Sequence, residues 1–70
     1  MKLSARNQLV GTIKDIKEDK LMAEITVSIQ GGQELVSVIT VSSARRLDLK
    51  VGKPVTVVIK STEVMLATED

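Results

Sequence analysis

The chain has 70 residues and contains neither Cys nor His, which excludes disulfides, thiolate and imidazole metal sites, and His general bases. Ten basic residues against nine acidic ones leave a net charge of +1, too small for an electrostatic footprint on DNA or on an anionic membrane. The hydrophobic content of 43% includes no Phe, Tyr or Trp. Most of it is Val, Ile, Leu, Ala and Met, and β-branched residues favour strands, so the composition indicates a β-rich core.

The length allows one domain, which we expect to span residues 1–70. A chain this short buries a smaller fraction of its surface than a domain of typical size, so its own core gives only marginal stability. Disulfides, metals and self-association are the usual remedies, and the composition leaves self-association, so we expect an oligomer. The N-terminus lacks the apolar segment of a secretory signal, and no apolar run approaches the roughly 18 residues of a membrane span. We therefore expect a cytoplasmic protein with no membrane partner.

Residues 7–16 predict a first strand, because their side chains fall on two sides at a period of two. One side carries Leu9, Gly11 and Ile13, and the other carries Val10, Thr12, Lys14 and Ile16. A glycine inside a strand, here Gly11, indicates a bulge, a sharp coil or a close approach of two backbones. The charged residues 17–20 are predicted to form a solvated hairpin turn.

Residues 23–30 give the clearest strand signal in the chain. Apolar and polar residues alternate over the whole segment, as in a sheet with one face in water. Gly31 and Gly32 then predict a two-residue hairpin turn, whose central positions favour positive φ. The third predicted strand, residues 34–41, is apolar on both sides and therefore needs a cover on each face. The interior of a barrel supplies one cover, and a neighbouring subunit could supply the other.

A short helix and two further strands complete the predicted fold. Ser42 and Ser43 predict an N-cap, followed by about one helical turn at residues 44–47. Residues 55–60 predict a fourth strand, and a short fifth strand is predicted from residue 62 or 63 to residue 67. A helix between the third and fourth strands of a five-stranded antiparallel set is typical of the OB-fold. We therefore predict an all-β, five-stranded OB-like Greek-key barrel with one short helix between strands 3 and 4.

Hydrogen-bond donors cluster near both ends of the chain. The donor side chains are those of Ser4, Arg6, Asn7, Lys60, Ser61 and Thr62. A tetrahedral dianion has only acceptors, so a site built from such groups suits it, and we expect the two ends to meet across a subunit boundary. Backbone N–H groups at residues 40–43 would complete the shell, since helix N-termini attract anions. The residues alone leave a second interpretation open, in which Arg6 and Lys60 pair with surface carboxylates.

Other chemistries find little support in the sequence. Lys60 and Ser61 are neighbours that point to opposite faces of a strand, which disfavours a Ser–Lys nucleophile pair. The carboxylates are scattered, without the spacing of a calcium loop. Single-stranded nucleic acids are usually bound through aromatic stacking and a basic groove, and the sequence has no aromatic residue and a charge near zero. Arg45 and Arg46 fit a solvated helix face better than an anion or nucleic-acid contact. We therefore expect no enzyme, no metal-cation site and no nucleic-acid partner.

The two end clusters resemble a known family. Ser-Ala-Arg-Asn-Gln at residues 4–8, with Lys-Ser-Thr-Glu-Val-Met at residues 60–65, is similar to the molbindins, small bacterial proteins made of one Mop domain. The same domain is paired in molybdate-responsive regulators and appended to molybdate transporter ATPases. The resemblance covers essentially the whole chain and includes the strand-to-helix region at residues 39–49.

The resemblance implies an OB-like barrel that binds molybdate, with tungstate as a substitute, at subunit interfaces. It also implies a homohexamer built as a trimer of dimers. By position, the oxyanion-binding residues would be Ser4, Ala5, Arg6, Asn7, Thr40, Val41, Ser42, Ser43, Lys60 and Ser61. The chain departs from the family at Arg45 and Arg46, where acidic or neutral residues are expected, and this bears on surface and assembly more than on the site.

These observations predict a non-enzymatic protein that binds molybdate for intracellular storage or homeostasis. Two alternatives stay open, a nucleic-acid-binding OB-fold module and a structural assembly domain with an incidental anion site. Titration with molybdate, sulfate and a single-stranded oligonucleotide separates the three.

Overall fold

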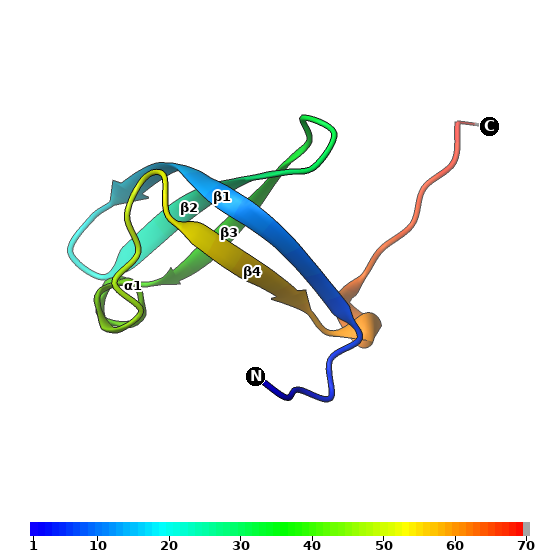
Figure 1. The fold of residues 1–70 in the computed structure, drawn as a ribbon, viewed down its shortest axis with the longest axis horizontal. Coiled ribbons are helices and arrows are strands. Elements are labelled where there is room, and N and C mark those ends of the chain that lie inside the picture. The colour runs from blue at the N-terminus through cyan, green and yellow to red at the C-terminus, as the bar shows by residue number, and fades with distance from the viewer. Residues whose placement is uncertain (70) are drawn as a thin grey trace.

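The computed structural model describes residues 1–69, which form one antiparallel sheet and a short helix (Figure 1). The sheet has four strands in the order β3-β2-β1-β4, so β3 and β4 are its two edges. The elements are β1 Asn7–Glu18, β2 Met22–Ile29, β3 Glu34–Thr40, α1 Val41–Arg46, β4 Pro54–Ile59 and the 3₁₀ turn η1 Ser61–Glu63. Within residues 1–69 there is no helix of the length and apolar character that crossing a membrane requires.

The hydrophobic core gathers side chains from β1, β2 and α1. The buried residues are Ile13, Ala23, Ile25, Val27, Val41 and Ala44. Three of them alternate along β2, so the predicted buried face of this strand is confirmed. The polar residues between them in β2 lie outside the core.

A bulge in β1 changes which of its side chains face the core. The pairing of β1 with β2 shifts between Ile13 and Asp15, which makes Lys14 an extra residue. Beyond the bulge, Ile16 pairs with Ile25 and packs against the core. The prediction that Ile16 lies on the same side as Lys14 was therefore wrong, because a strict period of two does not survive an inserted residue.

Gly11 marks a close approach of two backbones, one of the three predicted possibilities. It pairs with Ile29 of β2. A Cβ atom at this position would lie 2.7 Å from the carbonyl oxygen of Ser28 and 2.6 Å from Cγ1 of Val27. Only a residue without a side chain fits here, so Gly11 lets β1 and β2 pack closely in the middle of the sheet.

We expect Gly11→Ala to lower the free energy of unfolding by about 2–3 kcal/mol, the upper part of the usual range for overpacking. The added methyl group must displace the β2 backbone and not merely a flexible side chain. Urea denaturation followed by circular dichroism measures the loss. Val10→Ala is the matched control on the same strand, since Val10 is 73% exposed and its truncation should cost less than about 1 kcal/mol. Equal losses in the two variants would contradict the steric role of Gly11.

The turn between β1 and β2 is shorter than predicted and is organised by Asp19. Lys17 and Glu18 belong to β1, so the predicted charged turn at residues 17–20 begins two residues too early. One carboxylate oxygen of Asp19 accepts hydrogen bonds from the backbone N–H groups of Met22 and Leu21, both at 2.8 Å. These two bonds hold the pKa of Asp19 below its ordinary value.

We expect this turn to stabilise the fold less at acid pH. The folded-state pKa of Asp19 is lower than the unfolded one, so its contribution is full above the unfolded pKa of about 3.9 and disappears as pH falls through the folded pKa. Urea midpoints of the wild type and Asp19→Ala, measured between about pH 6 and about pH 2, test this. The difference in stability between the two proteins should shrink as the pH falls. A constant difference would contradict the role of the charged carboxylate.

The hairpin loop between β2 and β3 is longer than the predicted two-residue turn. Ile29 donates its N–H to the carbonyl oxygen of Gln33 at 2.9 Å, which leaves residues 30–32 as the loop. Gly31 and Gly32 have φ values of 90° and 82°, so the predicted positive φ is confirmed although the loop length was wrong. Hairpin loops of three residues also use glycine for the left-handed position, so a pair of glycines does not fix the length.

The helix α1 begins earlier than predicted. Thr40, the last residue of β3, is the N-cap, and its Oγ1 accepts a hydrogen bond from the N–H of Ser43 at 3.1 Å. Ser42 and Ser43 lie inside the first turn, so the prediction that they cap the helix was wrong. The hydroxyl of a Thr at the N-cap accepts a hydrogen bond from the backbone N–H three residues later, as that of a Ser does. Val41 consequently belongs to the helix and not to the preceding strand.

The predicted fifth strand is not formed in the described chain. After η1, residues 64–69 continue without a strand partner and run away from the sheet (Figure 1). Val64, Met65 and Leu66, here called the apolar tail, are 45%, 92% and 93% exposed. The all-β class and the helix between strands 3 and 4 are confirmed. The sheet stays open between β3 and β4, because no strand formed by residues 1–69 pairs with their free edges.

Candidate functional site

A shallow depression at one end of the sheet gathers donors from both ends of the chain. It encloses about 210 Å³ and is lined by Ser4, Ala5, Arg6, Lys60, Ser61 and Thr62. The lining offers three hydroxyls, a guanidinium and an ammonium, with no carboxylate. We call it the donor depression. The two end clusters meet within one chain, whereas the sequence predicted a meeting across a subunit boundary.

Pairing between β1 and β4 explains why the two ends meet. Asn7 is the first residue of β1 and pairs with Ile59, the last residue of β4, so the segments on either side leave the sheet at the same point. The side-chain amide of Asn7 donates to the carbonyl oxygen of Ile59 at 3.3 Å, and that of Gln8 donates to the carbonyl oxygen of Ala5 at 2.8 Å. Asn7 thus lies next to the depression and is bonded to the sheet, without being part of the lining.

Arg6 and Lys60 give the donor depression its positive charge. The ion pairs found in residues 1–69 use other cations, namely Lys14, Arg45, Lys50 and Lys53. Neither Arg6 nor Lys60 forms an ion pair with a surface carboxylate in the described chain, so the alternative interpretation has no support there. The two positive charges on this small surface repel each other, and both would attract a dianion placed between them.

The predicted ligands around the start of α1 lie far from the donor depression. Thr40 pairs with Met22 at the first residue of β2, whereas the depression lies beside the first residue of β1. The 12 residues of β1 separate the two places, up to about 36 Å for a straight strand. Thr40 Oγ1 lies 2.9 Å from Ser43 Oγ and 3.2 Å from Ser42 Oγ, and we call these three groups the hydroxyl cluster. A single chain does not bring both donor sets to one ligand.

Val41 has different surroundings from the other predicted ligands. Its side chain is part of the core, and its N–H donates to the carbonyl oxygen of Leu21 at 2.8 Å. Arg45 and Arg46 are exposed in the last turn of the helix, and Arg45 lies 3.9 Å from a carboxylate oxygen of Glu18. Both arginines are outside the lining of the donor depression, in keeping with the predicted solvated helix face.

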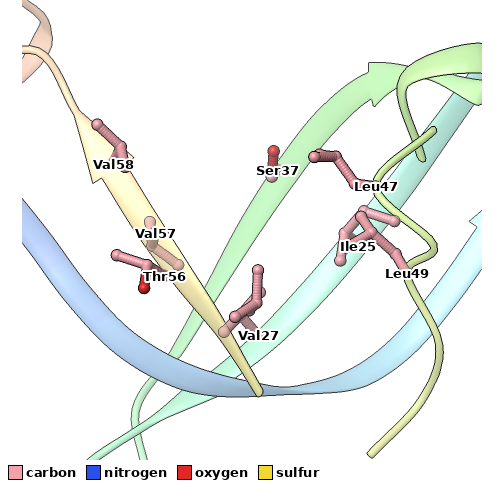
Figure 2. Close-up of a pocket in the computed structure, with 9 residues that line it drawn as sticks. Ile25, Val27, Ser37, Leu47, Leu49, Thr56, Val57 and Val58 are labelled. Atoms are coloured by element: carbon pink, nitrogen blue, oxygen red, sulfur yellow. The ribbon is translucent and has the colours of Figure 1, made fainter. Parts of the chain in front are cut away.

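A second hollow, which no sequence pattern had predicted, lies between the two edges of the sheet. It encloses about 160 Å³ and is lined by Ile25, Val27, Ser37, Leu47, Leu49 and residues 55–58. Figure 2 shows Ser37 on β3, Val57 and Val58 on β4, Val27 beside β4, and Ile25 next to Leu47 and Leu49. The lining is mostly apolar, with Ser37 and Thr56 as its polar members, and we call this hollow the apolar groove. The feature of the sequence that could have indicated this groove is the row of apolar residues in the fourth strand, which needs a covering partner.

The part of the chain that the structure describes contains no cluster of side chains suited to bind a metal cation. No three His, Cys, Asp or Glu side chains come together there. At the donor depression, three hydroxyls and two cationic side chains favour hydrogen bonding and charge attraction to an anion.

Comparison with known proteins shows the family. The TOBE domain matches residues 3–66, and the chain belongs to the TOBE domain family. Over 66 residues it is 42% identical to molybdenum-pterin-binding protein 1 of Clostridium pasteurianum, covering 94% of this chain and 97% of that protein. A molybdate-binding protein from Sporomusa ovata is 41% identical, with a TM-score of 0.91 over 97% of this chain and 100% of that one. The cytoplasmic molybdate-binding protein ModG, with molybdate bound, is 43% identical, with a TM-score of 0.84 over 87% of this chain and 43% of that one.

Proposed function

We propose that the protein binds molybdate and holds it for intracellular storage or homeostasis, without catalysing a reaction. The observation that carries this proposal is the donor depression, where Arg6, Lys60 and three hydroxyls stand together with no carboxylate. An anion that only accepts hydrogen bonds is matched by a site that only donates them. The similarity to molybdate-binding proteins supports molybdate as the anion. Tungstate has the same charge and shape, so we propose it as a substitute ligand, and the cytoplasm as the compartment.

We propose that the complete site is shared between two copies of one Mop domain, residues 1–70. One copy supplies the donor depression and its neighbour Asn7, and the other supplies residues 40–43 with the hydroxyl cluster. The depression is shallow, so a bound dianion would keep one side in water, where charge attraction is weak. A second donor set would cover that side. The hydroxyl cluster lies toward the other end of β1 in the same chain, which supports its coming from another copy.

We further propose that the apolar tail of one copy closes the barrel of another. The tail is exposed, and the apolar groove lies between two sheet edges with unpaired backbone groups. A strand placed there would pair with those edges and remove apolar side chains from water. This supplies the fifth strand of the predicted OB-like barrel and makes the protein a homo-oligomer. The family resemblance implies a hexamer, built as a trimer of dimers.

Sedimentation of the wild type and two charged variants tests the assembly. We expect Leu66→Asp to dissociate the oligomer, because a carboxylate cannot enter an apolar groove without a large desolvation cost. Val51→Asp is the matched control, since Val51 is 64% exposed and belongs neither to the tail nor to the groove. Dissociation in both variants, or in neither, would contradict the role of the tail. A stable wild-type monomer would overturn the assembly itself.

Calorimetric titration with molybdate, sulfate and a single-stranded oligonucleotide tests the function. We expect saturable binding of molybdate and no binding of the oligonucleotide. Tight binding of the oligonucleotide without molybdate would instead favour a nucleic-acid-binding OB-fold module. Binding of none of the three would leave a structural assembly domain with an incidental anion site.

A further inference from the structure

The 3₁₀ turn η1 joins the donor depression directly to the apolar tail. Its first two residues, Ser61 and Thr62, line the depression together with Lys60. Its last residue is Glu63, and the tail begins at the next position. One residue, Glu63, therefore separates the lining of the donor depression from the apolar tail.

The turn is lightly held in a single chain. The β1–β4 ladder ends at the pair of Asn7 and Ile59, and beyond it the N–H of Glu63 donates to the carbonyl oxygen of Lys60 at 2.9 Å. η1 contains no buried residue, and its N-cap makes no side-chain hydrogen bond. Lys60 and Ser61 are thus not fixed in advance, and ordering them on binding costs conformational entropy.

We infer that the apolar tail, seated in a second copy, positions Lys60 and Ser61 for the anion, and that the bound anion in turn holds the tail in its seat. This inference rests on the proposed function. The backbone at Val64 is already extended, with φ −89° and ψ 121°, so a tail paired as a strand would fix the end of η1 without a change of direction. Met65 and Leu66 are then positioning residues, which act on the anion through η1 and never touch it.

Thermodynamic linkage makes the coupling reciprocal. The factor by which a seated tail raises the affinity for molybdate must equal the factor by which molybdate favours seating of the tail. The apparent affinity is proportional to the fraction of tails that are seated, because only that fraction is competent to bind. Molybdate should therefore slow hydrogen exchange of the backbone amides at residues 64–66, although none of them lines the donor depression.

A matched pair of variants at the junction tests the coupling. Glu63→Gly and Glu63→Ala remove the same carboxylate, but only glycine adds backbone freedom between η1 and the tail. We expect the Kd for molybdate to be about two- to fivefold higher for Glu63→Gly than for Glu63→Ala, the range that follows from the extra freedom of glycine. The titration is done at a protein concentration at which sedimentation shows both variants fully assembled, so that a loss of oligomer is not mistaken for a loss of positioning.

The outcomes separate the inference from the function on which it rests. Failure of the wild type to bind molybdate overturns the proposed function and the inference together. Binding by the wild type with equal Kd values for the two variants overturns the inference alone. So does hydrogen exchange of the tail amides that is the same with and without molybdate in the assembled wild type. Slower exchange with molybdate, together with the difference between the variants, supports it.

Discussion

Arg6→Met and Lys60→Met should each weaken molybdate binding by about 30-fold or more. Molybdate carries two negative charges, and the donor depression offers one guanidinium and one ammonium to compensate them. Removing either leaves the anion partly uncompensated in a desolvated site, a loss of roughly 2–5 kcal/mol for a buried charge pair. Methionine keeps most of the apolar packing of the long side chain and deletes the charge together with its N–H donors. Isothermal titration of each variant measures the effect.

Arg45→Met is the control for this pair of variants. Arg45 is exposed on α1 and lies near Glu18, outside the donor depression. Its removal changes the net charge of the chain by the same amount as the other two substitutions, so it corrects for any general charge effect. We expect little change in molybdate affinity. If Arg45→Met weakens binding and Lys60→Met does not, the anion lies at the helix and the proposed site is wrong.

Two differently damaged variants should recover molybdate binding when they are unfolded and refolded together. Lys60→Met damages the donor depression, and the double variant Ser42→Ala/Ser43→Ala damages the hydroxyl cluster while keeping the Thr40 cap. Each variant alone has a defect in every site. In mixed oligomers an intact depression of one chain meets an intact cluster of another, and random pairing at a symmetric interface restores about a quarter of the sites. The stoichiometry of high-affinity binding measures the recovery.

A mixture of Lys60→Met and Arg6→Met is the control for this experiment. Both substitutions damage the same depression, so no combination of these chains contains an intact one. Recovery in this control, or no recovery in the first mixture, would mean that the site is not divided between copies as proposed. The first mixture also distinguishes a shared site from two separate half-sites, because separate half-sites would not complement each other.

The parts of the fold that depend on local pattern could be predicted from the sequence. The alternation in β2 identified the buried residues Ala23, Ile25 and Val27, because a sheet with one covered face imposes a period of two. The donor types at the two ends identified most of the lining of the depression. Their meeting in one chain follows from the pairing of Asn7 with Ile59, a long-range register that no local pattern encodes.

The predictions that were wrong depend on local departures from a regular pattern or on long-range pairing. No particular residue type marks the bulge at Lys14. The spacing of the apolar residues therefore could not assign Ile16 to the core side. Thr40, Ser42 and Ser43 are all good N-caps, and which of them caps α1 is decided by where β3 ends. Residues 64–69 fit the pattern of a strand, but in the described chain they pair with neither free edge of the sheet, β3 or β4.

The free edges of β3 and β4 also bear on the kinetics of folding. In the single chain, both edges present unpaired backbone groups beside an apolar surface, an arrangement that favours pairing with unrelated strands. If the barrel closes by tail exchange as proposed, closure is a bimolecular step, so its rate falls as the chains are diluted. Two copies joined by a flexible linker would make the step intramolecular, at an effective concentration in about the millimolar range. Such a tandem chain would close its barrels at dilutions at which separate copies stay open and exposed.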